Sequence, residues 1–390
     1  MEHDPSPPKV RAIPPAPAAG GTPDDPARIR QYHRQKLALQ LAGIPLSLAY
    51  WAACCIIARP AAELIAALDP GRWAGLLLLA LLVLGGSVAV HLPLDYYDGF
   101  VVEHRFGLSN QTFRKWLRFQ ATGWLVGAVV GTALLVLLYG TLWYGGRFWG
   151  VWLWAGALLL TVVLARLVPL VILPLFYPSR PLDRPALVDR LNALAAGSGM
   201  RLTGVFDLGL SEETKKANAM LAGLGSTRRV YLSDTLLESF NEREIGVVFA
   251  HELGHHVRRH VAKRIVLIAV VSSVHVALIC WLLGPHAGGP PEAWVPAAAA
   301  LPGVMLLTTI FNLLVGPLIC AVGRRFERQA DCYALDRTGD PEAFRSAFER
   351  LSRQNLADPN PPRWEEILLD DHPALSRRIA MAEAYAREKR

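Results

Sequence analysis

Six long apolar stretches constrain the fold of this 390-residue chain more than any other feature of its sequence. An α-helix rises ~1.5 Å per residue, so about 20 apolar residues suffice to cross the ~30 Å hydrocarbon core of a bilayer. Hydrophobic residues make up 52% of the chain, which exceeds the usual share in soluble domains. We therefore predict a mainly α-helical, polytopic membrane protein. Its six predicted spans cover approximately residues 39–58, 73–94, 123–143, 148–176, 265–283 and 295–322.

Lysine and arginine alternate between the two sides of these spans. The connection between the second and third spans carries four basic residues, whereas residues 284–294, between the fifth and sixth, carry none. Because short cytoplasmic loops are enriched in Lys and Arg, both termini and the polar region 178–260 are predicted to face the cytoplasm. The net charge of +7 suits anionic lipid headgroups and not nucleic acid, because the basic residues flank apolar stretches. The Ala-, Arg- and Gly-rich composition is typical of a bacterial protein, so we expect a bacterial inner-membrane location.

An H-E-x-x-H motif occupies residues 251–255, in an amphipathic segment that residues 241–244 can begin with a capping box. Residues four apart share one face of a helix, so His251 and His255 can both point at one metal ion. Glu252 would then lie beside that ion, where it can take a proton from a water molecule held there. The alternative is a surface helix that carries histidines by chance, and the spacing favours a zinc hydrolase over it.

A third metal ligand is expected after the sixth span. Catalytic zinc usually has three protein ligands and one open position. Glu327 and Asp331 lie four apart, so on a helix they share one face. Glu327 can complete a His-His-Glu site, and Asp331 can accept a hydrogen bond from a ligating histidine and so orient its ring. Alone, the two residues would fit an Arg/Glu-rich helix with i,i+4 pairs. Beside the motif, they predict one zinc ion per chain, bound by His251, His255 and Glu327.

Three further histidines receive no chemical role. His256 and His260 fall off the helix face shared by His251 and His255, so both are expected at the cytoplasmic surface. His275 lies inside an apolar span and is expected to be a hydrogen-bonded core residue.

The polar region between the fourth and fifth spans is predicted to form a small α/β unit. Ala186–Ala196 has the pattern of an amphipathic helix that ends at Gly197, and Leu202–Leu208 and Val230–Leu232 are typical of strands. Ala217–Ala222 is a candidate edge strand, either for pairing with an extended peptide or simply as part of a sheet beneath the zinc helix. The predicted organisation is a disordered Pro/Ala-rich tail (1–30), four spans (31–177), a cytoplasmic α/β catalytic domain (178–260), two spans (261–322) and a C-terminal helical region that completes the zinc site (323–390).

Several segments together resemble one known family. They are Phe100–Thr112, Asn218-Ala219, Val230–Leu237, the H-E-L-G-H core, Arg324–Asp331 and Asp371–Arg378. With these segments, the chain from about residue 90 onward resembles the type 1 CAAX prenyl endopeptidases, integral-membrane zinc metalloproteases of the gluzincin type that cut prenylated C-termini. Gly323 stands where that family usually has Ser, and the N-terminal extension has no counterpart in it.

The resemblance implies a fold and several residue roles. It implies a helical barrel that encloses a water-filled chamber, with the zinc site at its cytoplasmic end. It also implies that Asn218, next to Ala219, holds the substrate backbone, and that His372 and Arg378 face the reacting carbonyl. Pro373 suits the first turn of a helix and so places His372 at its start. Without the resemblance, His372 would fit an incidental helix cap and Arg378 a solvated charge.

The predicted function is that of a membrane-embedded zinc metalloendopeptidase, with Glu252 as the general base, acting on membrane-associated or prenylated proteins. Its expected partners are a peptide or protein substrate, with or without a lipid, and the bilayer; we expect a monomer. One alternative is a quality-control zinc protease like the heat-shock-induced membrane metalloproteases, which the Phe100–Thr112 segment disfavours. The other is a non-catalytic membrane scaffold with structural zinc, which would not need Glu252.

Overall fold

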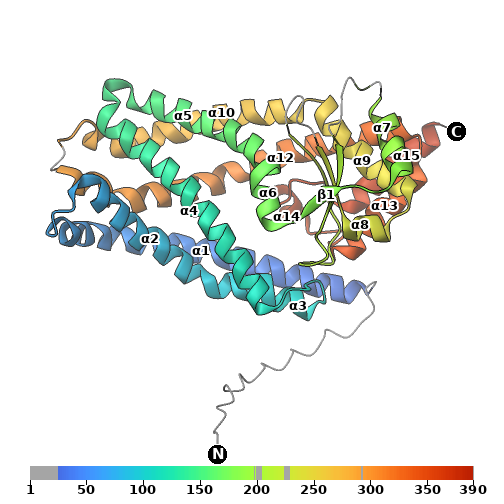
Figure 1. Cartoon of the computed structure of the whole chain (residues 1–390), viewed down its shortest axis with the longest axis horizontal. Coiled ribbons are helices and arrows are strands. Elements are labelled where there is room, and N and C mark those ends of the chain that lie inside the picture. The colour runs from blue at the N-terminus through green and yellow to red at the C-terminus, as the bar shows by residue number, and fades with distance from the viewer. Residues whose placement is uncertain (1–24, 197, 199–203, 224–228, 291–292, 390) are drawn as a thin grey trace, which may run out of the picture.

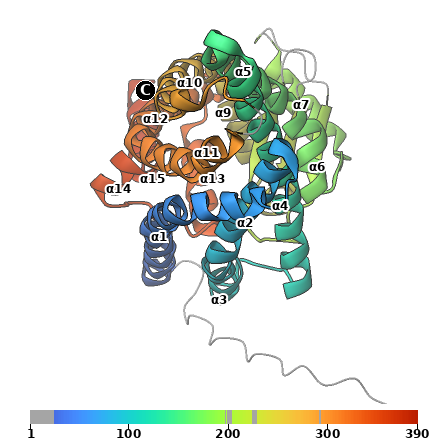
Figure 2. The same cartoon turned by 90° about the vertical axis from the view of Figure 1, so that its left-hand side faces the viewer.

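The computed structural model of the chain describes residues 25–196, 198, 204–223, 229–290 and 293–389. Its described residues include six helical segments that are long and apolar enough to cross a membrane, as predicted (Figure 1). Viewed end-on, these long helices are arranged around a ring (Figure 2). They are α1 (Pro26–Ala66), α2 (Gly71–Tyr96) continued by π-helical Tyr97–Val102 and α3 (Glu103–Arg105), α4 (Phe113–Tyr144), α5 (Trp149–Leu167) continued by π-helical Val168–Ile172 and α6 (Leu173–Phe176), α10 (His260–Leu283), and α12 (Leu301–Thr338) preceded by the short α11 (Trp294–Ala299).

The first helix begins earlier than the predicted tail would allow. Most of that tail lies outside the described residues, but α1 already starts at Pro26. The Asp25 carboxylate accepts a hydrogen bond from the Ala27 backbone N–H at 2.8 Å, and proline suits the first turn because its nitrogen needs no partner there. Residues 26–30 are therefore helical, and the predicted boundary at residue 30 is corrected.

The last long helix is much longer than a membrane crossing needs. Helix α12 has 38 residues. At ~1.5 Å per residue it extends about 57 Å, nearly twice the thickness of the hydrocarbon core. Its C-terminal turns therefore continue into the other half of the molecule, where they pack along α9 (Glu242–Val257). This continuation carries Glu327 and Asp331 toward the H-E-x-x-H helix.

A four-stranded sheet forms the centre of that second half (Figure 1). The strand order is β1-β2-β4-β3, with β2 and β4 parallel and the other two pairs antiparallel. The edge position of β3 agrees with the prediction for Ala217–Ala222. Helices α7 and α9 enclose an apolar core with the sheet that includes Leu191, Leu232 and Phe249. The bounds are β1 Ser179–Pro181, β2 Gly204–Leu208, β3 Ala219–Ala222, β4 Arg229–Ser233, α7 Pro185–Ala195 and α8 Asp234–Ser239.

The predicted elements of this unit are present with small shifts. Helix α7 ends at Ala195, and Gly197, the predicted stop, lies outside the described residues. The start of the predicted strand Leu202–Leu208 is likewise undescribed, and β2 is seen from Gly204 onward. Three C-terminal helices follow α12: the first and third pack together around Phe344 against α9 and α12, and the second contacts α12. They are α13 (Pro341–Gln354), α14 (Arg363–Leu368) and α15 (Leu375–Glu388).

Candidate active site and metal centre

Helix α9 carries the H-E-x-x-H motif and begins with the predicted capping box. The Asn241 side chain accepts hydrogen bonds from the backbone N–H groups of Arg243 and Glu244, both at 3.0 Å. The Glu244 carboxylate in turn accepts one from the Asn241 N–H at 2.9 Å. This pairing satisfies N–H groups that have no partner inside the first helical turn. The helix is therefore fixed at its start, nine residues before His251.

Three side chains of α9 and α12 converge on one point. Nε2 of His251 lies 3.2 Å from Oε2 of Glu327, Nε2 of His255 lies 3.3 Å from Oε1 of Glu327, and the two Nε2 atoms are 3.3 Å apart. Within the described part of the chain, this is the only group of three such side chains with metal-binding geometry. Oε2 of Glu327 is buried and has no hydrogen-bond partner. A buried carboxylate oxygen beside two imidazole nitrogens fits a cation held between them, because such a cation can accept a lone pair from each of the three atoms.

A carboxylate and a guanidinium stand behind the first histidine. Nδ1 of His251 lies 2.8 Å from Oδ1 of Asp331, which is fully buried. Burial disfavours the charged imidazole, but the hydrogen bond and the charge of Asp331 outweigh it and raise the pKa of His251 to about 9. Arg378 bonds both Asp331 oxygens, at 2.9 and 2.5 Å, and stacks 3.8 Å above the Phe348 ring. Its side chain is only 10% exposed, and its guanidinium is paired with Asp331.

Glu252 lies on the same helix, next to His251, and is half-buried. Burial raises the pKa of the Glu252 carboxyl, and the negative charge of Glu327 raises it further against the opposing effect of His251. The backbone N–H of Leu221 on β3 donates a hydrogen bond to this carboxylate. A carboxylate whose pKa is raised by burial binds a proton more readily, which is what a general base needs.

His372 reaches the same site from the segment before α15. Its Nε2 lies 3.4 Å from Oε2 of Glu327, and its Nδ1 lies 2.6 Å from Oδ1 of Asp371. That hydrogen bond raises the pKa of His372. The side chain is 57% exposed and lines a cavity of about 470 Å³ together with Phe348 and Arg378. The exposed imidazole is therefore accessible from the cavity.

The edge strand β3 lies directly beside this centre. The backbone of Asn218 faces β4, because its N–H donates to Oγ of Ser233 and its C=O accepts from the Ser233 N–H, both at 2.9 Å. Backbone groups alternate in direction along an antiparallel strand, so Ala219 and Leu221 point toward the free edge. The C=O of Leu221 already accepts a hydrogen bond from Nε2 of His256 at 3.0 Å. This leaves the backbone of Ala219 directed outward, next to the exposed side chain of Asn218.

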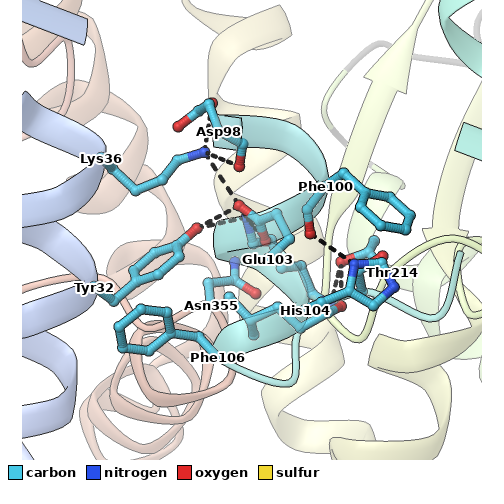
Figure 3. A network of polar contacts seen from close by, with 12 residues as sticks. Tyr32, Lys36, Asp98, Phe100, Glu103, His104, Phe106, Thr214 and Asn355 are labelled. Carbon is cyan, nitrogen blue, oxygen red and sulfur yellow. Dashed lines mark hydrogen bonds and ion pairs between the residues drawn. The ribbon is translucent and has the colours of Figure 1, made fainter. Parts of the chain in front are cut away.

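The segment before β3 is held by the N-terminal membrane helices (Figure 3). Nζ of Lys216 lies 3.0 Å from a carboxylate oxygen of Glu103 and 2.9 Å from the hydroxyl of Tyr32 on α1. The Asn355 side chain binds both backbone groups of Ala217: it accepts a hydrogen bond from the N–H at 2.9 Å and donates one to the C=O at 3.1 Å. The Phe100–Thr112 segment, which contains Glu103, therefore helps to position the strand beside the metal centre.

Sequence reasoning missed His260. It was expected at the surface, but it is 1% exposed and its Nδ1 lies 3.1 Å from Nδ1 of His255. Helix α9 ends at Val257, and Arg259 has the left-handed φ of 56°, which turns the chain so that α10 starts with the His260 ring beside His255. No glycine or proline signals this break in the sequence. His256 is half-buried through its bond to β3, which also corrects its predicted surface position.

The remaining histidine behaves as predicted. Nε2 of His275 lies 3.1 Å from Oγ1 of Thr308, and its ring stacks on Phe311 with centroids 4.7 Å apart. It has no contact with the metal centre.

Comparisons with known proteins agree with this geometry. The profile of peptidase family M48 matches residues 181–386. The profile of the CAAX prenyl protease N-terminal region, which is described as five membrane helices, matches residues 9–178. The described residues of that range contain four candidate spans. An uncharacterized metalloprotease of Bacillus subtilis, YhfN, is 26% identical over 94% of this chain and 87% of its own length. CAAX prenyl protease 1 of Saccharomyces cerevisiae is 28% identical over 78% of this chain and 71% of its own.

A solved structure has the same fold. The crystal structure of S. mikatae Ste24p superposes with a TM-score of 0.79, at 23% identity, over 91% of this chain and 87% of that one. The M48 profile covers more than half of the sequence and contains the helix on which His251, Glu252 and His255 meet Glu327. The chain therefore belongs to peptidase family M48 and is an integral, multi-pass membrane metalloprotease that acts on peptide or protein substrates.

Proposed function

We propose that the metal is a single zinc ion held by His251, His255 and Glu327. Two neutral imidazole nitrogens and one carboxylate oxygen, with a fourth position left open, are the usual donors of catalytic zinc. The convergence of these three side chains, with Oε2 of Glu327 lacking any hydrogen-bond partner, is the observation that carries the assignment. Asp331 orients the His251 ring through its Nδ1, and Arg378 holds the Asp331 carboxylate in place by hydrogen bonding to it.

The reaction is hydrolysis of a peptide bond by water. When bound, zinc would supply a Lewis acid that polarises the scissile carbonyl and acidifies water. Glu252 accepts the proton of the attacking water and delivers it to the leaving amine. The Nε2–H of His372 donates to the carbonyl oxygen as negative charge develops there. Support for these roles comes from the raised pKa of the Glu252 carboxyl and from the His372 ring, which lies 3.4 Å from Glu327 and is open to the cavity.

The substrate is proposed to lie as an extended strand along β3. The outward-facing backbone of Ala219 would form the hydrogen bonds of β-augmentation, and the exposed side-chain amide of Asn218 would hold a neighbouring substrate carbonyl. The Leu221 N–H bond to Glu252 fixes the distance between this strand and the general base. An extended chain paired in this way passes the metal centre with its backbone presented for cleavage.

The substrates are proposed to be membrane-associated proteins, including prenylated proteins with CAAX-like C-termini. Support comes from the relatives named CAAX prenyl protease 1 in yeast and from the position of the site where the long helices meet the sheet. The distribution of Lys and Arg supports an orientation with the site and both termini in the cytoplasm, and the composition supports a bacterial inner membrane. We propose that the protein works as a monomer.

The test compares the purified full-length wild type with Glu252→Gln. Both should contain one zinc per chain by metal analysis, whereas cleavage of a peptide should fall by at least ~10²–10⁴ in the variant. Matched peptides with and without a prenyl group decide whether the lipid is recognised. Proteomics of membranes that carry either form then identifies natural substrates by the C-terminal fragments that only the active enzyme releases. A zinc-loaded wild type that cleaves no peptide would favour the alternative of a non-catalytic membrane scaffold with structural zinc.

A further inference from the structure

The two histidines of the metal centre differ in what lies behind them. His251 has the anionic Asp331 at its Nδ1, whereas His255 has the imidazole of His260. Nε2 of His260 lies 2.9 Å from Oε1 of Gln329. His255, His260 and Gln329 therefore form a chain of two hydrogen bonds that leads away from the metal centre through the buried His260.

The protons in this chain can be assigned from either end. Oε1 of Gln329 only accepts, so Nε2 of His260 carries the proton and its Nδ1 is left as an acceptor. Nδ1 of His255 then donates to it, which leaves the lone pair of His255 Nε2 facing Glu327. From the other end, a metal ligand at Nε2 of His255 must carry its proton on Nδ1, which requires the same arrangement. Both directions give one set of tautomers.

The His260 ring is held in one orientation by α12. It stacks on Phe326 with ring centroids 4.3 Å apart and planes only 7° from parallel. Phe326 and Gln329 flank Glu327 on the same helix, so the residue that binds the metal and the residues that fix His260 move as one unit.

We infer that His260 and Gln329 are positioning residues that hold His255 in its metal-binding tautomer and ring orientation. This inference rests on the proposed assignment of His251, His255 and Glu327 as metal ligands. Residues that orient a ligating histidine typically affect metal affinity by about 10- to 100-fold. A neutral acceptor does this without adding a further negative charge to a site that already contains Glu327 and Asp331. The pair would therefore tune how tightly zinc is held, separately from Asp331.

The test uses two substitutions with opposite properties. His260→Phe keeps an aromatic ring on Phe326 but removes the acceptor for His255. His260→Asn loses the ring but can place its Oδ1 near the position of the imidazole Nδ1. We expect zinc affinity, measured on the full-length protein by competition with a chelator, to weaken by about 10- to 100-fold in H260F and to stay close to wild type in H260N. If His260 only filled space, the order would be reversed, because Asn leaves a cavity and Phe does not.

Two controls complete the experiment. His275→Phe makes the same replacement in the same helix, at another histidine stacked on a phenylalanine, and should leave zinc affinity unchanged. Gln329→Leu should weaken zinc binding less than H260F. It removes the acceptor that fixes the proton on Nε2 of His260, but it leaves the His260 ring beside His255. Cobalt(II) titration, whose visible absorption depends on ligand geometry, should show an altered spectrum for H260F and not for H275F.

The outcomes separate this inference from the ligand assignment. Wild-type affinity in H260F, or equal weakening in H260N and H260F, would overturn the role of His260. Wild type that binds no zinc, or His255→Ala that retains it, would instead overturn the proposed metal site.

Discussion

Gly254 and Ala330 bring the backbones of α9 and α12 into direct contact. A Cβ atom on Gly254 would lie 3.0 Å from Cα and 3.1 Å from the carbonyl oxygen of Ala330. Backbone atoms cannot move aside as a flexible side chain can, so a side chain at this position would force the two helices slightly apart. The close crossing sets the distance between the histidines of α9 and Glu327 of α12.

The first prediction follows from this crossing. Gly254→Ala should push α9 and α12 apart and weaken zinc binding strongly, even though alanine favours helix by about 0.5–1 kcal/mol over glycine. Gly246→Ala in the same helix is the control, because a Cβ atom there meets nothing nearer than 3.4 Å and should leave the protein as stable as before or slightly more stable. Metal analysis and thermal unfolding of both variants check this. Full zinc content in G254A would contradict it.

The second prediction concerns His372. His372→Ala should keep zinc and the fold yet lower kcat by ~10²–10³ with little change in KM, because a donor aimed at the developing oxyanion acts only in the transition state. Steady-state kinetics on zinc-loaded protein measures this. A kcat near that of the wild type would leave His372 without a role in the reaction.

The third prediction concerns the substrate strand. Asn218→Ala should raise KM or lower kcat/KM by the ~1–3 kcal/mol of an unmade hydrogen bond. Ala219→Pro should have a similar effect without unfolding the protein, because an edge strand tolerates proline where its N–H faces away from the sheet. The two variants together distinguish side-chain from backbone binding, and unchanged kinetics in both would place the substrate elsewhere.

The fourth prediction concerns orientation. In a variant without the five native cysteines, single cysteines at Leu68 and Phe148 should react with an impermeant thiol reagent added outside the cell. A cysteine at Arg387 should react only after the membrane is opened. These positions flank different spans, so labelling of Arg387→Cys from outside would reverse the proposed topology.

The fifth prediction concerns acid stability. Arg243, at the start of α9, bonds both oxygens of Asp340 at 2.8 and 2.9 Å, and this hydrogen bonding lowers the pKa of Asp340. A carboxyl whose folded pKa is depressed stabilises the protein above its unfolded pKa and loses that effect as pH falls through the folded one. The melting temperature of Asp340→Asn, which keeps a helix cap, should therefore be lower than that of the wild type at pH 7. The two melting temperatures should converge in acid, and a constant difference across pH would contradict the ion-pair explanation.

The sequence by itself determined the six long apolar helices, because their length and hydropathy are local properties that the bilayer thickness converts into spans. It also identified the H-E-x-x-H helix with its capping box and Glu327 and Asp331 four residues apart, because helical periodicity places such residues on one face. The edge strand β3 followed from its composition and its neighbouring turn.

Only the tertiary structure decided which groups support these residues. The burial of His260 depends on one left-handed residue, Arg259, which no sequence pattern indicates. The bonds of Arg378 to Asp331 depend on how α15 packs against α12, because its long side chain can reach several partners from the same helical position. Contacts between helices distant in the sequence, such as Gly254 with Ala330, arise from packing of whole elements and are not encoded by any local spacing.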